Sequence, residues 1–227
     1  SEWAYFFCRD CPSGYSAVGG QTLNPYGRLD FGTGGSSSGS GASIAANYAA
    51  VAVGSETSGS ILSPSSANSL VGLKPTTGSL SRSGVVPISS TLDTVGPMGR
   101  SVADVVTLFN AMVGFDGGDP AMPRLSEDLR LIIRQAPTDN GTFGILTTYA
   151  DNMQYQNALR LLSENGFNLQ EVDFQNERHP RFSEFLGAEM KRDLVSYLQK
   201  NASASVEIDS VSTLQEFNLV DPEMRAP

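Results

Sequence analysis

Two glycine- and serine-rich turns limit how this chain can fold. Residues 34–41 have the sequence Gly-Gly-Ser-Ser-Ser-Gly-Ser-Gly, and residues 54–60 have the sequence Gly-Ser-Glu-Thr-Ser-Gly-Ser. Glycine has no Cβ and serine bonds locally to the main chain, so such turns let a backbone approach a substrate closely. Taken alone, the first turn is also typical of a flexible linker or an anion-binding nest. The helix and the second turn that follow it favour a built site around Ser36 and Ser60.

Short apolar runs and helical periodicity predict alternating helices and strands between the first turn and residue 113. They are a helix over 38–50, a strand over 51–53, a helical turn from 61, a strand over 70–75, a loop with a short strand over 84–88 and a helix over 101–113. Ser101 is a good N-cap for the last helix, because Asp104 follows three residues later in its first turn. Asp93 and Asp104 are expected to be satisfied structural carboxylates.

The second half of the chain predicts a βαβ unit followed by a long helix. After a turn-rich connection over 114–126, the pattern indicates a strand over 143–146, a helix over 153–163 ended by Gly166, and a strand over 167–174. A helix over 182–200 follows, because five apolar residues lie close to one face. These are Phe185, Met190, Leu194, Tyr197 and Leu198.

Composition excludes several classes of function. The formal net charge of -9 argues against a nucleic-acid partner, because affinity for phosphates rests mainly on Lys and Arg. One histidine, His179, and two cysteines, Cys8 and Cys11, are too few for a zinc site. The Cys-Arg-Asp-Cys spacing is also compatible with a redox pair or half of a zinc site, but the cysteines are expected to be ordinary thiols in a loop. His179 is expected to be a solvated loop residue. No run approaches the ~18 consecutive apolar residues of a membrane-spanning helix, so no membrane partner is expected.

Five motifs follow one another along the first half of the chain. They are residues 14–22 (Gly-Tyr-Ser-Ala-Val-Gly-Gly-Gln-Thr), 34–41, 54–61, 72–76 (Gly-Leu-Lys-Pro-Thr) and 93–98 (Asp-Thr-Val-Gly-Pro-Met) with 101–104 (Ser-Val-Ala-Asp). Together they closely resemble the amidase-signature hydrolases, and most of all the branch that includes bacterial peptide amidase. The resemblance implies an α/β fold with a mixed β-sheet core flanked by helices. It also implies that the chain is an incomplete view of a larger single domain. Residues 1–116 then form the signature core with both serines, and residues 117–227 continue the same domain.

The resemblance also implies a Ser-cisSer-Lys triad without a cofactor or a metal. Ser60 matches the nucleophile and Ser36 matches the bridging serine, which is held on a cis peptide bond. The backbone N–H groups of Thr57, Ser58 and Gly59, together with that of Ser60, match the segment that lines the oxyanion hole. The candidate substrate-binding residues are Gly35 and Gln21, and Gln21 is equally compatible with a contact to backbone.

The third member of the triad is missing from the sequence. In the family the general base is a lysine well before the first serine, whereas the lysines here are Lys74, Lys191 and Lys200, all of which follow Ser60. Lys74 is not expected to be the base, because a strand end before proline offers no evident burial to keep an amine neutral. The abrupt ends of the chain favour a longer enzyme whose lysine strand and C-terminal part are absent here, over a degenerate relative that lost catalysis.

These implications predict an amidohydrolase that cleaves the C–N bond of a linear carboxamide, with a peptide C-terminal amide as the candidate substrate and a small-molecule amide as the other. One alternative is the glutaminase subunit of a tRNA-dependent amidotransferase. Leu62 weakens this alternative, because Leu62 occupies a position where some relatives carry an arginine that would bind an acidic substrate. Another alternative is an inactive amidase-fold interaction module. Ser58 also departs from the family pattern of Gly or Asp and adds a hydroxyl beside the nucleophile.

Overall fold

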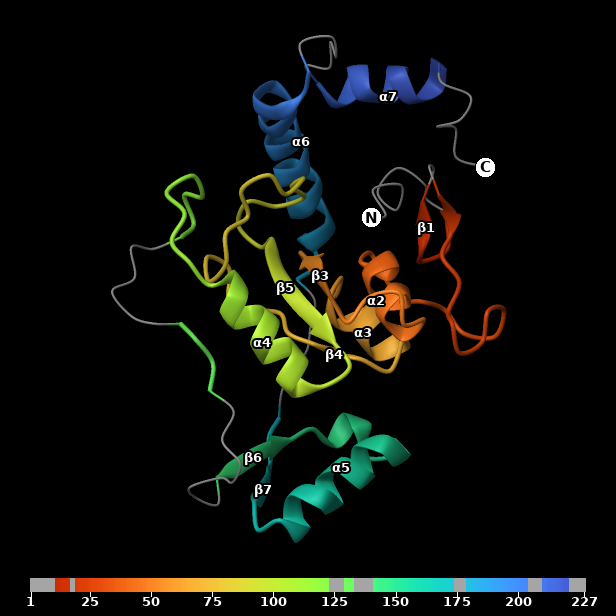
Figure 1. The fold of residues 1–227 in the computed structure, drawn as a ribbon, viewed down its shortest axis with the longest axis vertical. Helices are drawn as coiled ribbons and strands as arrows, with labels where there is room; N and C mark the ends of the chain where they lie inside the picture. The colour runs from red at the N-terminus through yellow and green to blue at the C-terminus, as the bar shows by residue number, and fades with distance from the viewer. Residues whose placement is uncertain are drawn as a thin grey trace. The chain divides into compact units, whose positions relative to one another are not determined.

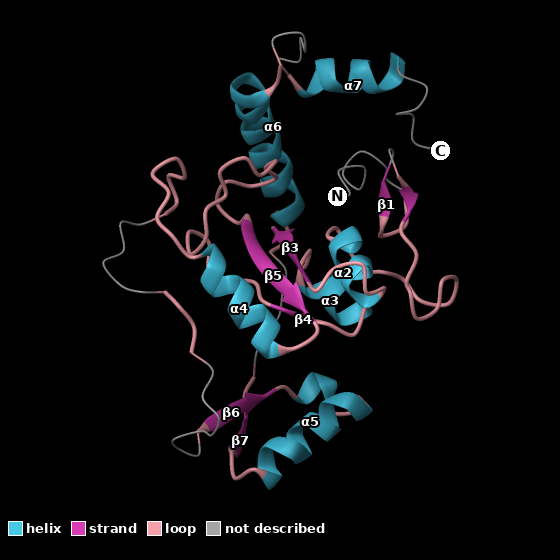
Figure 2. Ribbon diagram, viewed as in Figure 1, coloured by secondary structure: helices cyan, strands magenta, loops and turns pink. Residues whose placement is uncertain are grey.

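The computed structural model describes residues 11–16, 19–122, 129–132, 141–173, 179–203 and 210–220 (Figure 1). The chain forms two compact units. Unit 1 comprises Ser1–Ile132 and Ser183–Pro227, and unit 2 comprises Ile133–Phe182. Helices and strands occur in both units, and the strand pairs are antiparallel in unit 1 and parallel in unit 2 (Figure 2). The expected α/β class is confirmed.

An antiparallel sheet forms the centre of unit 1. Its order is β3 (Val51–Glu56), β5 (Thr94–Gly99) and β4 (Val71–Gly72), and every residue of β5 is buried. The predicted strand over 70–75 is therefore shorter than expected. Its pairing ends where Gly72 lies opposite Met98, because the next residue of β5, Pro97, has no N–H to donate. Beyond that point the Leu73 N–H donates to the Pro97 carbonyl at 3.0 Å.

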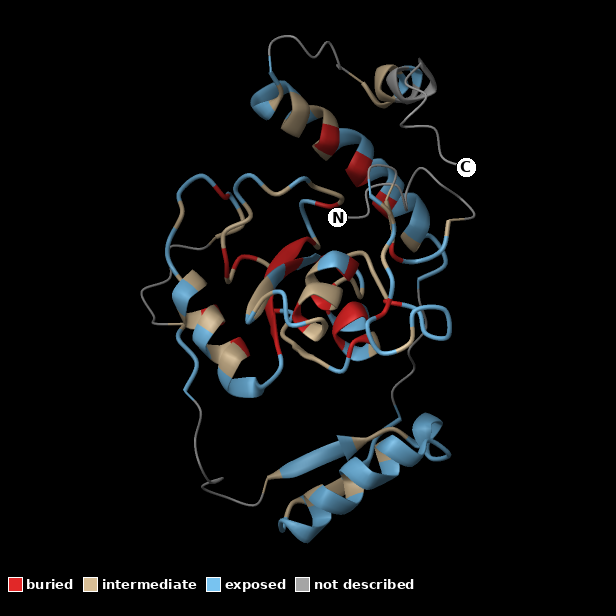
Figure 3. Cartoon of the chain, turned by 45° about the vertical axis from the view of Figure 1, so that its right-hand side comes forward, coloured by how far each residue is buried: buried red, intermediate tan, exposed pale blue. Residues whose placement is uncertain are grey.

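Helices cover both faces of this sheet. Side chains alternate between the two faces of a strand, so Met98 and Val95 of β5 point in opposite directions. Met98 is buried against Ile44 of α2 (Ser38–Ala45) and against Ile61, which precedes α3 (Leu62–Ala67). On the other face Val95 is buried with Leu80 and with Phe109 of α4 (Val102–Met112) (Figure 3). Fully burying each of these side chains contributes about 1.5–3 kcal/mol.

The boundaries of these helices test the sequence predictions. The helix predicted over 38–50 ends at Ala45, because Asn47 adopts a left-handed conformation with φ 61°, which stops the helix. The helical turn from 61 and the helix from 101 are confirmed. Ser101 caps α4, accepting from the Asp104 N–H while the Asp104 carboxylate accepts from the Ser101 N–H. Asp104 is thus a satisfied structural carboxylate, as expected.

Residues 84–88 form a loop, so the short strand predicted there is wrong. Their N–H groups are engaged elsewhere: Val85 donates to the Arg82 carbonyl at 3.0 Å, and Ile88 donates to the Asp93 carboxylate at 2.8 Å. The sequence predictions also omitted β5 itself and the antiparallel hairpin of β1 (Tyr15–Ser16) and β2 (Gly20–Gln21).

The long helix α6 (Phe182–Asn201) is confirmed, but its buried face differs from the predicted one. Leu186, Met190 and Leu194 are buried at a spacing of four residues, whereas Phe185 is 41% exposed. One residue corresponds to a rotation of about 100° on a helix, so Phe185 lies off the buried stripe. A further helix, α7 (Val211–Val220), follows.

Unit 2 is the predicted βαβ unit. Strand β6 (Thr142–Ile145) is followed by the 3₁₀ turn η1 (Thr147–Tyr149), by α5 (Met153–Glu164) and by β7 (Asn168–Glu171), which pairs parallel to β6. Asn152 caps α5 by accepting from the Tyr155 N–H, and Gly166 takes a positive φ of 84° after its end. Strand β7 is shorter than predicted, and Phe174 lies outside the described residues.

Two further predictions concern the cysteines and membrane contact. Cys11 is disulfide-bonded, so the expectation of an ordinary thiol is wrong for this residue; Cys8 lies outside the described residues. None of the helices in the described part combines the length and the hydropathy that a bilayer span requires.

Candidate active site

The turn that carries Ser36 lies directly against the start of α3. Gly34 has a φ of +62°, and a Cβ at this position would lie 2.7 Å from the carbonyl carbon and oxygen of Ser63. The Ser37 N–H donates to the Ser60 carbonyl at 3.2 Å. The peptide bond between Gly35 and Ser36 is cis, as the resemblance implied. The two serine-bearing turns are therefore neighbours in the structure.

Side chains tie the first turn to the sheet and to α3. The Ser37 hydroxyl accepts from the Ser55 N–H and donates to the Ser55 carbonyl, each at 3.2 Å, which joins the turn to β3. The fully buried Asn68 amide donates to the Thr33 carbonyl at 2.9 Å and to the Pro64 carbonyl at 2.8 Å. These contacts fix the turn at both of its ends.

A buried carboxylate closes the second turn. Glu56, at the end of β3, is 4% exposed, and its Oε2 accepts from the N–H groups of Ile61 at 2.7 Å and Leu62 at 3.0 Å. A carboxylate at the start of a helix satisfies N–H groups that have no partner inside the helix. Glu56 and α3 thus hold the two ends of the segment 57–60 together.

The segment 57–60 presents its N–H groups without protein acceptors. In the described part of the chain, the N–H groups of Ser58, Gly59 and Ser60 donate to no other group. Gly59 has a φ of +89°, and the space that a side chain there would occupy is open. Successive N–H groups in such a turn form a concavity that attracts negative charge. This is the chemistry that an oxyanion requires.

Thr57 begins this segment, and its side chain is held by Asp93. Its hydroxyl donates to Oδ1 of Asp93 at 2.5 Å, and Oδ2 of Asp93 accepts from Ile88 N–H at 2.8 Å and Ser89 N–H at 2.9 Å. Burial raises the pKa of the Asp93 carboxyl above its ordinary value, while the hydrogen bonds from Thr57, Ser89 and Ile88 act to lower it. Asp93 is a satisfied carboxylate, as expected.

Most of the predicted site residues lie in or beside the two serine-bearing turns. Ser36, Gly35, Thr57, Gly59 and Ser60 are half-buried around the two turns, and Ser58 is exposed beside them. In the described part of the chain the Ser36 and Ser60 hydroxyls have no hydrogen-bond partner, each other included. Catalytic hydrogen bonds in an enzyme without substrate are often long and tighten only when substrate binds.

Gln21 and Lys74 lie outside this arrangement. The Gln21 side chain is exposed, and its Nε2 donates to the carbonyls of Ser13 and Thr22, each at 3.0 Å, so of the two alternatives it contacts backbone. Lys74 is exposed and donates to the neighbouring Pro75 carbonyl at 3.1 Å.

Two residues of the site were not predicted from the sequence. Glu56 had a local signal, since an acidic residue after an apolar strand and shortly before a helix is typical of a helix start. Nothing in the sequence indicated that Asp93 contacts Thr57, because the two residues come from separate motifs. His, Cys, Asp and Glu side chains form no group of three or more placed to hold a metal within the described ranges.

The fold and the site together define an α/β protein with two serine-bearing turns, supported by a buried sheet, beside a row of free N–H groups. The Amidase family model matches residues 7–226, and the chain therefore belongs to this family. A 127-residue stretch covering 56% of the chain is 53% identical to the probable amidase At4g34880 of Arabidopsis thaliana, of which it covers 25%.

Two other relatives are a subunit of an amidotransferase and a peptide amidase of known structure. A glutamyl-tRNA(Gln) amidotransferase subunit of Symbiobacterium thermophilum is 51% identical over 107 residues, which is 47% of this chain and 22% of that protein. The structure of native peptide amidase from Stenotrophomonas maltophilia superposes with a TM-score of 0.77 at 34% identity, covering 95% of this chain and 46% of that one. The chain thus spans about a quarter of the length of these sequence relatives and less than half of that solved structure.

Proposed function

We propose that this protein is an amidohydrolase in which Ser60 is the nucleophile and Ser36 the bridging serine. The observation that carries the proposal is the hydrogen bond from Ser37 N–H to the Ser60 carbonyl, at 3.2 Å, which holds the two serine turns side by side. The free N–H groups of the segment 57–60 support the same assignment. Residues 1–116 and 117–227 then belong to one amidase domain that continues in the longer protein.

In the proposed reaction, Ser60 Oγ attacks the carbonyl carbon of a carboxamide, and its proton passes through Ser36 to a neutral lysine supplied by the longer protein. The oxyanion is stabilised by the N–H groups of residues 57–60, each of which typically contributes ~3 kcal/mol. The C–N bond then breaks, and the amine leaves with the proton. Water finally attacks the acyl-enzyme, releasing the carboxylic acid and regenerating Ser60.

The proposed substrate is a peptide with a C-terminal amide. The 34% identity to a peptide amidase across nearly the whole chain supports this class. Leu62, which is 46% exposed beside the segment 57–60, presents no cation to an acidic side chain. An uncharged acyl group therefore suits this position better than a free glutamate or glutamine.

The test is covalent labelling of the full-length protein with a fluorophosphonate probe. Ser60→Ala is expected to abolish labelling, because the probe bonds to the nucleophilic oxygen. Ser66→Ala is the matched control, since Ser66 is an exposed serine on α3 and should leave labelling unchanged. Undiminished labelling of Ser60→Ala would refute the nucleophile assignment. Absence of labelling in the wild-type protein would support an inactive interaction module instead.

A glutaminase component of an amidotransferase is the second candidate function, because of the 51% identity to a subunit of such an enzyme. Ammonia release separates the two. The amidohydrolase proposal expects faster release from a peptide amide than from free glutamine, without any partner protein. Release from glutamine that requires added partner subunits would favour the amidotransferase.

A further inference from the structure

A network of hydrogen-bonded polar side chains connects the segment 57–60 to α6. Asp93 stands at its centre, 7% exposed, with both carboxylate oxygens engaged. One oxygen accepts from the Thr57 hydroxyl and the other from the N–H groups of Ile88 and Ser89. These donors belong to two loops far apart in sequence, so the carboxylate joins the loop 88–93 to the first residue of the proposed oxyanion segment.

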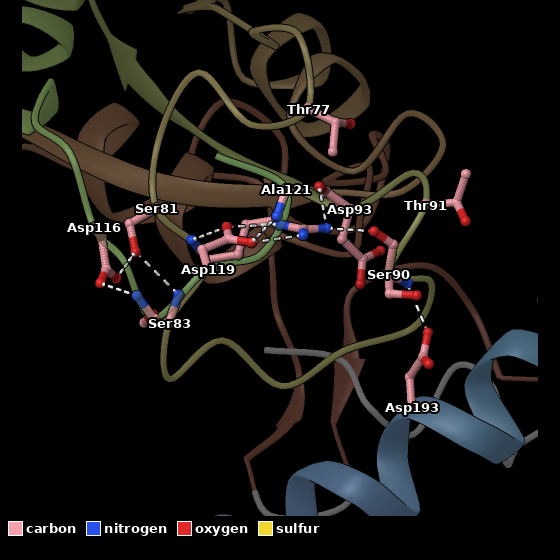
Figure 4. A network of polar contacts seen from close by, with 12 residues as sticks. Thr77, Ser81, Ser83, Ser90, Thr91, Asp93, Asp116, Asp119, Ala121 and Asp193 are labelled. Carbon is pink, nitrogen blue, oxygen red and sulfur yellow. Dashed lines mark hydrogen bonds and ion pairs between the residues drawn. The ribbon is translucent and has the colours of Figure 1, made fainter. Parts of the chain in front are cut away.

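The loop 88–93 is itself held by α6. The buried Ser89 hydroxyl donates to Oε2 of Glu189, and the Thr91 hydroxyl donates to Oε1 of the same residue at 2.8 Å. One turn further along α6, Asp193 accepts from the Ser90 N–H at 2.7 Å, a contact visible in Figure 4. An unbroken series of hydrogen bonds therefore runs from α6 through the loop 88–93 and Asp93 to Thr57.

We propose that Asp93 is a positioning residue that holds Thr57, and with it the N–H groups of residues 58–60, in the geometry that stabilises the oxyanion. The inference rests on the proposed amidohydrolase function. Asp93 does not touch the substrate and acts only through the Thr57 hydroxyl. Glu189 of α6 supports the same arrangement, because it accepts hydrogen bonds from the loop 88–93, which contains Asp93.

The chemistry of the position explains why a carboxylate is needed. All three groups that face Asp93 are donors, and an ionised carboxylate is an acceptor on both oxygens. Asparagine has one acceptor oxygen and one NH₂ group, so its oxygen still accepts from the two N–H groups while its NH₂ group faces the Thr57 hydroxyl, which changes from donor to acceptor. Asp93→Asn therefore replaces a hydrogen bond to a charged acceptor with a weaker neutral one, without removing any side-chain volume.

The experiment measures the rate of fluorophosphonate labelling of Ser60 in the full-length protein, separated into a maximal rate and a binding constant. Thr57→Val replaces the hydroxyl with a methyl group and keeps the shape of the side chain. It is expected to lower the maximal rate about 10- to 100-fold, because a displacement of about 1 Å at a reacting centre costs up to that much. The binding constant is expected to stay within about twofold, since the Thr57 hydroxyl is bonded to Asp93 and not available to the probe.

Three further variants isolate the positioning role from a general loss of stability. Thr57→Ser retains the hydroxyl and is expected to restore the rate to within about threefold of wild type. Asp93→Asn combined with Thr57→Val is expected to be no slower than the slower single variant, because both substitutions act on the same interaction. Asp116→Asn is the matched control: Asp116 accepts from Ser81 and Gly118 in the same polar region without contacting residues 57–60.

Unchanged labelling by Thr57→Val, or effects of the two substitutions that multiply, would overturn the positioning role while leaving Ser60 as the nucleophile. Labelling that persists in Ser60→Ala would instead overturn the proposed function, and the positioning role with it. If Asp93→Asn does not fold, the comparison of Thr57→Val with Thr57→Ser decides the matter alone.

Discussion

The two compact units of this chain differ in how they use buried polar groups. Around the serine turns of unit 1, buried side chains such as Glu56, Asn68 and Asp93 each bond to two or more backbone groups. In unit 2 none of the described residues is fully buried, and α5 carries no buried residue. Unit 2 contains an aromatic contact between Phe143 and Phe167, whose ring centroids lie 5.2 Å apart in an edge-to-face arrangement.

The comparison indicates where substitutions will matter. A buried polar group left without its partner costs about 1–3 kcal/mol, and a buried charge costs more, whereas exposed partners are replaced by water at little cost. The stability of unit 1 therefore depends on individual buried hydrogen bonds, whereas the stability of unit 2 depends on the general pattern of its βαβ elements. Figure 3 shows the corresponding distribution of buried residues within each unit.

Gly34→Ala is expected to have the largest effect and to break the geometry of unit 1. The new Cβ would lie 2.7 Å from the Ser63 backbone, at a residue whose φ of +62° already disfavours a side chain. We expect a loss of about 3–5 kcal/mol in the free energy of unfolding, from overpacking and the left-handed conformation together. Thermal unfolding and fluorophosphonate labelling check it, and both should fall.

Gly39→Ala is the matched control for this change. Gly39 lies in α2, and no atom is within 4 Å of the position its Cβ would occupy. Alanine favours a helix over glycine by roughly 0.5–1 kcal/mol, so this variant should be as stable as wild type or slightly more stable. Equal losses in the two glycine variants would contradict the close approach of Gly34 to α3.

Asp119→Asn is expected to have the next largest effect. Asp119 forms a bidentate ion pair with Arg82, at 2.8 Å for Nη2 to Oδ1, and the side chains of Asp119 and Arg82 are 2% and 11% exposed. Removing one partner of a buried pair leaves the other charge uncompensated, so we expect a loss of about 3 kcal/mol. Chemical denaturation at neutral pH measures it.

The same ion pair predicts a pH dependence. The hydrogen bond from Arg82 lowers the pKa of Asp119 from 3.8 to about 2. Because the pKa is lower in the folded state, the stabilisation is complete above the unfolded value and disappears as the pH falls from about 4 through about 2. The difference in unfolding free energy between wild type and Asp119→Asn should shrink over that interval. A constant difference would contradict the assignment of the shift to Asp119.

Glu164→Gln should have the smallest effect and sharpens the contrast between the units. Glu164 pairs with Arg160 on α5 at 2.7 Å, but both side chains are more than half exposed. Exposed pairs at this helical spacing contribute about 0.3–0.5 kcal/mol. Adding salt should remove the difference from wild type. A loss as large as that of Asp119→Asn would contradict the comparison of the two units.

Much of the local structure was predictable, because its causes lie within a few residues. The N-cap of α4 at Ser101, the βαβ unit and the long helix α6 all follow from capping residues, glycine positions and apolar periodicity. The cis peptide bond at Ser36 came from the family resemblance, not from periodicity. Errors occurred where the deciding partner was distant, as at the omitted strand β5, which pairs with β3 and β4 from other parts of the chain.

The sequence by itself determined the family, the two serine-bearing turns and the order of most elements, since glycine, proline and capping residues act through short-range sterics and hydrogen bonds. Only the tertiary structure decided which strand is central, how Asp93 meets Thr57, and that Glu189 of α6 holds the loop between them. Such contacts join residues far apart along the chain. Their geometry depends on how the sheet and its helices pack, which no local pattern encodes.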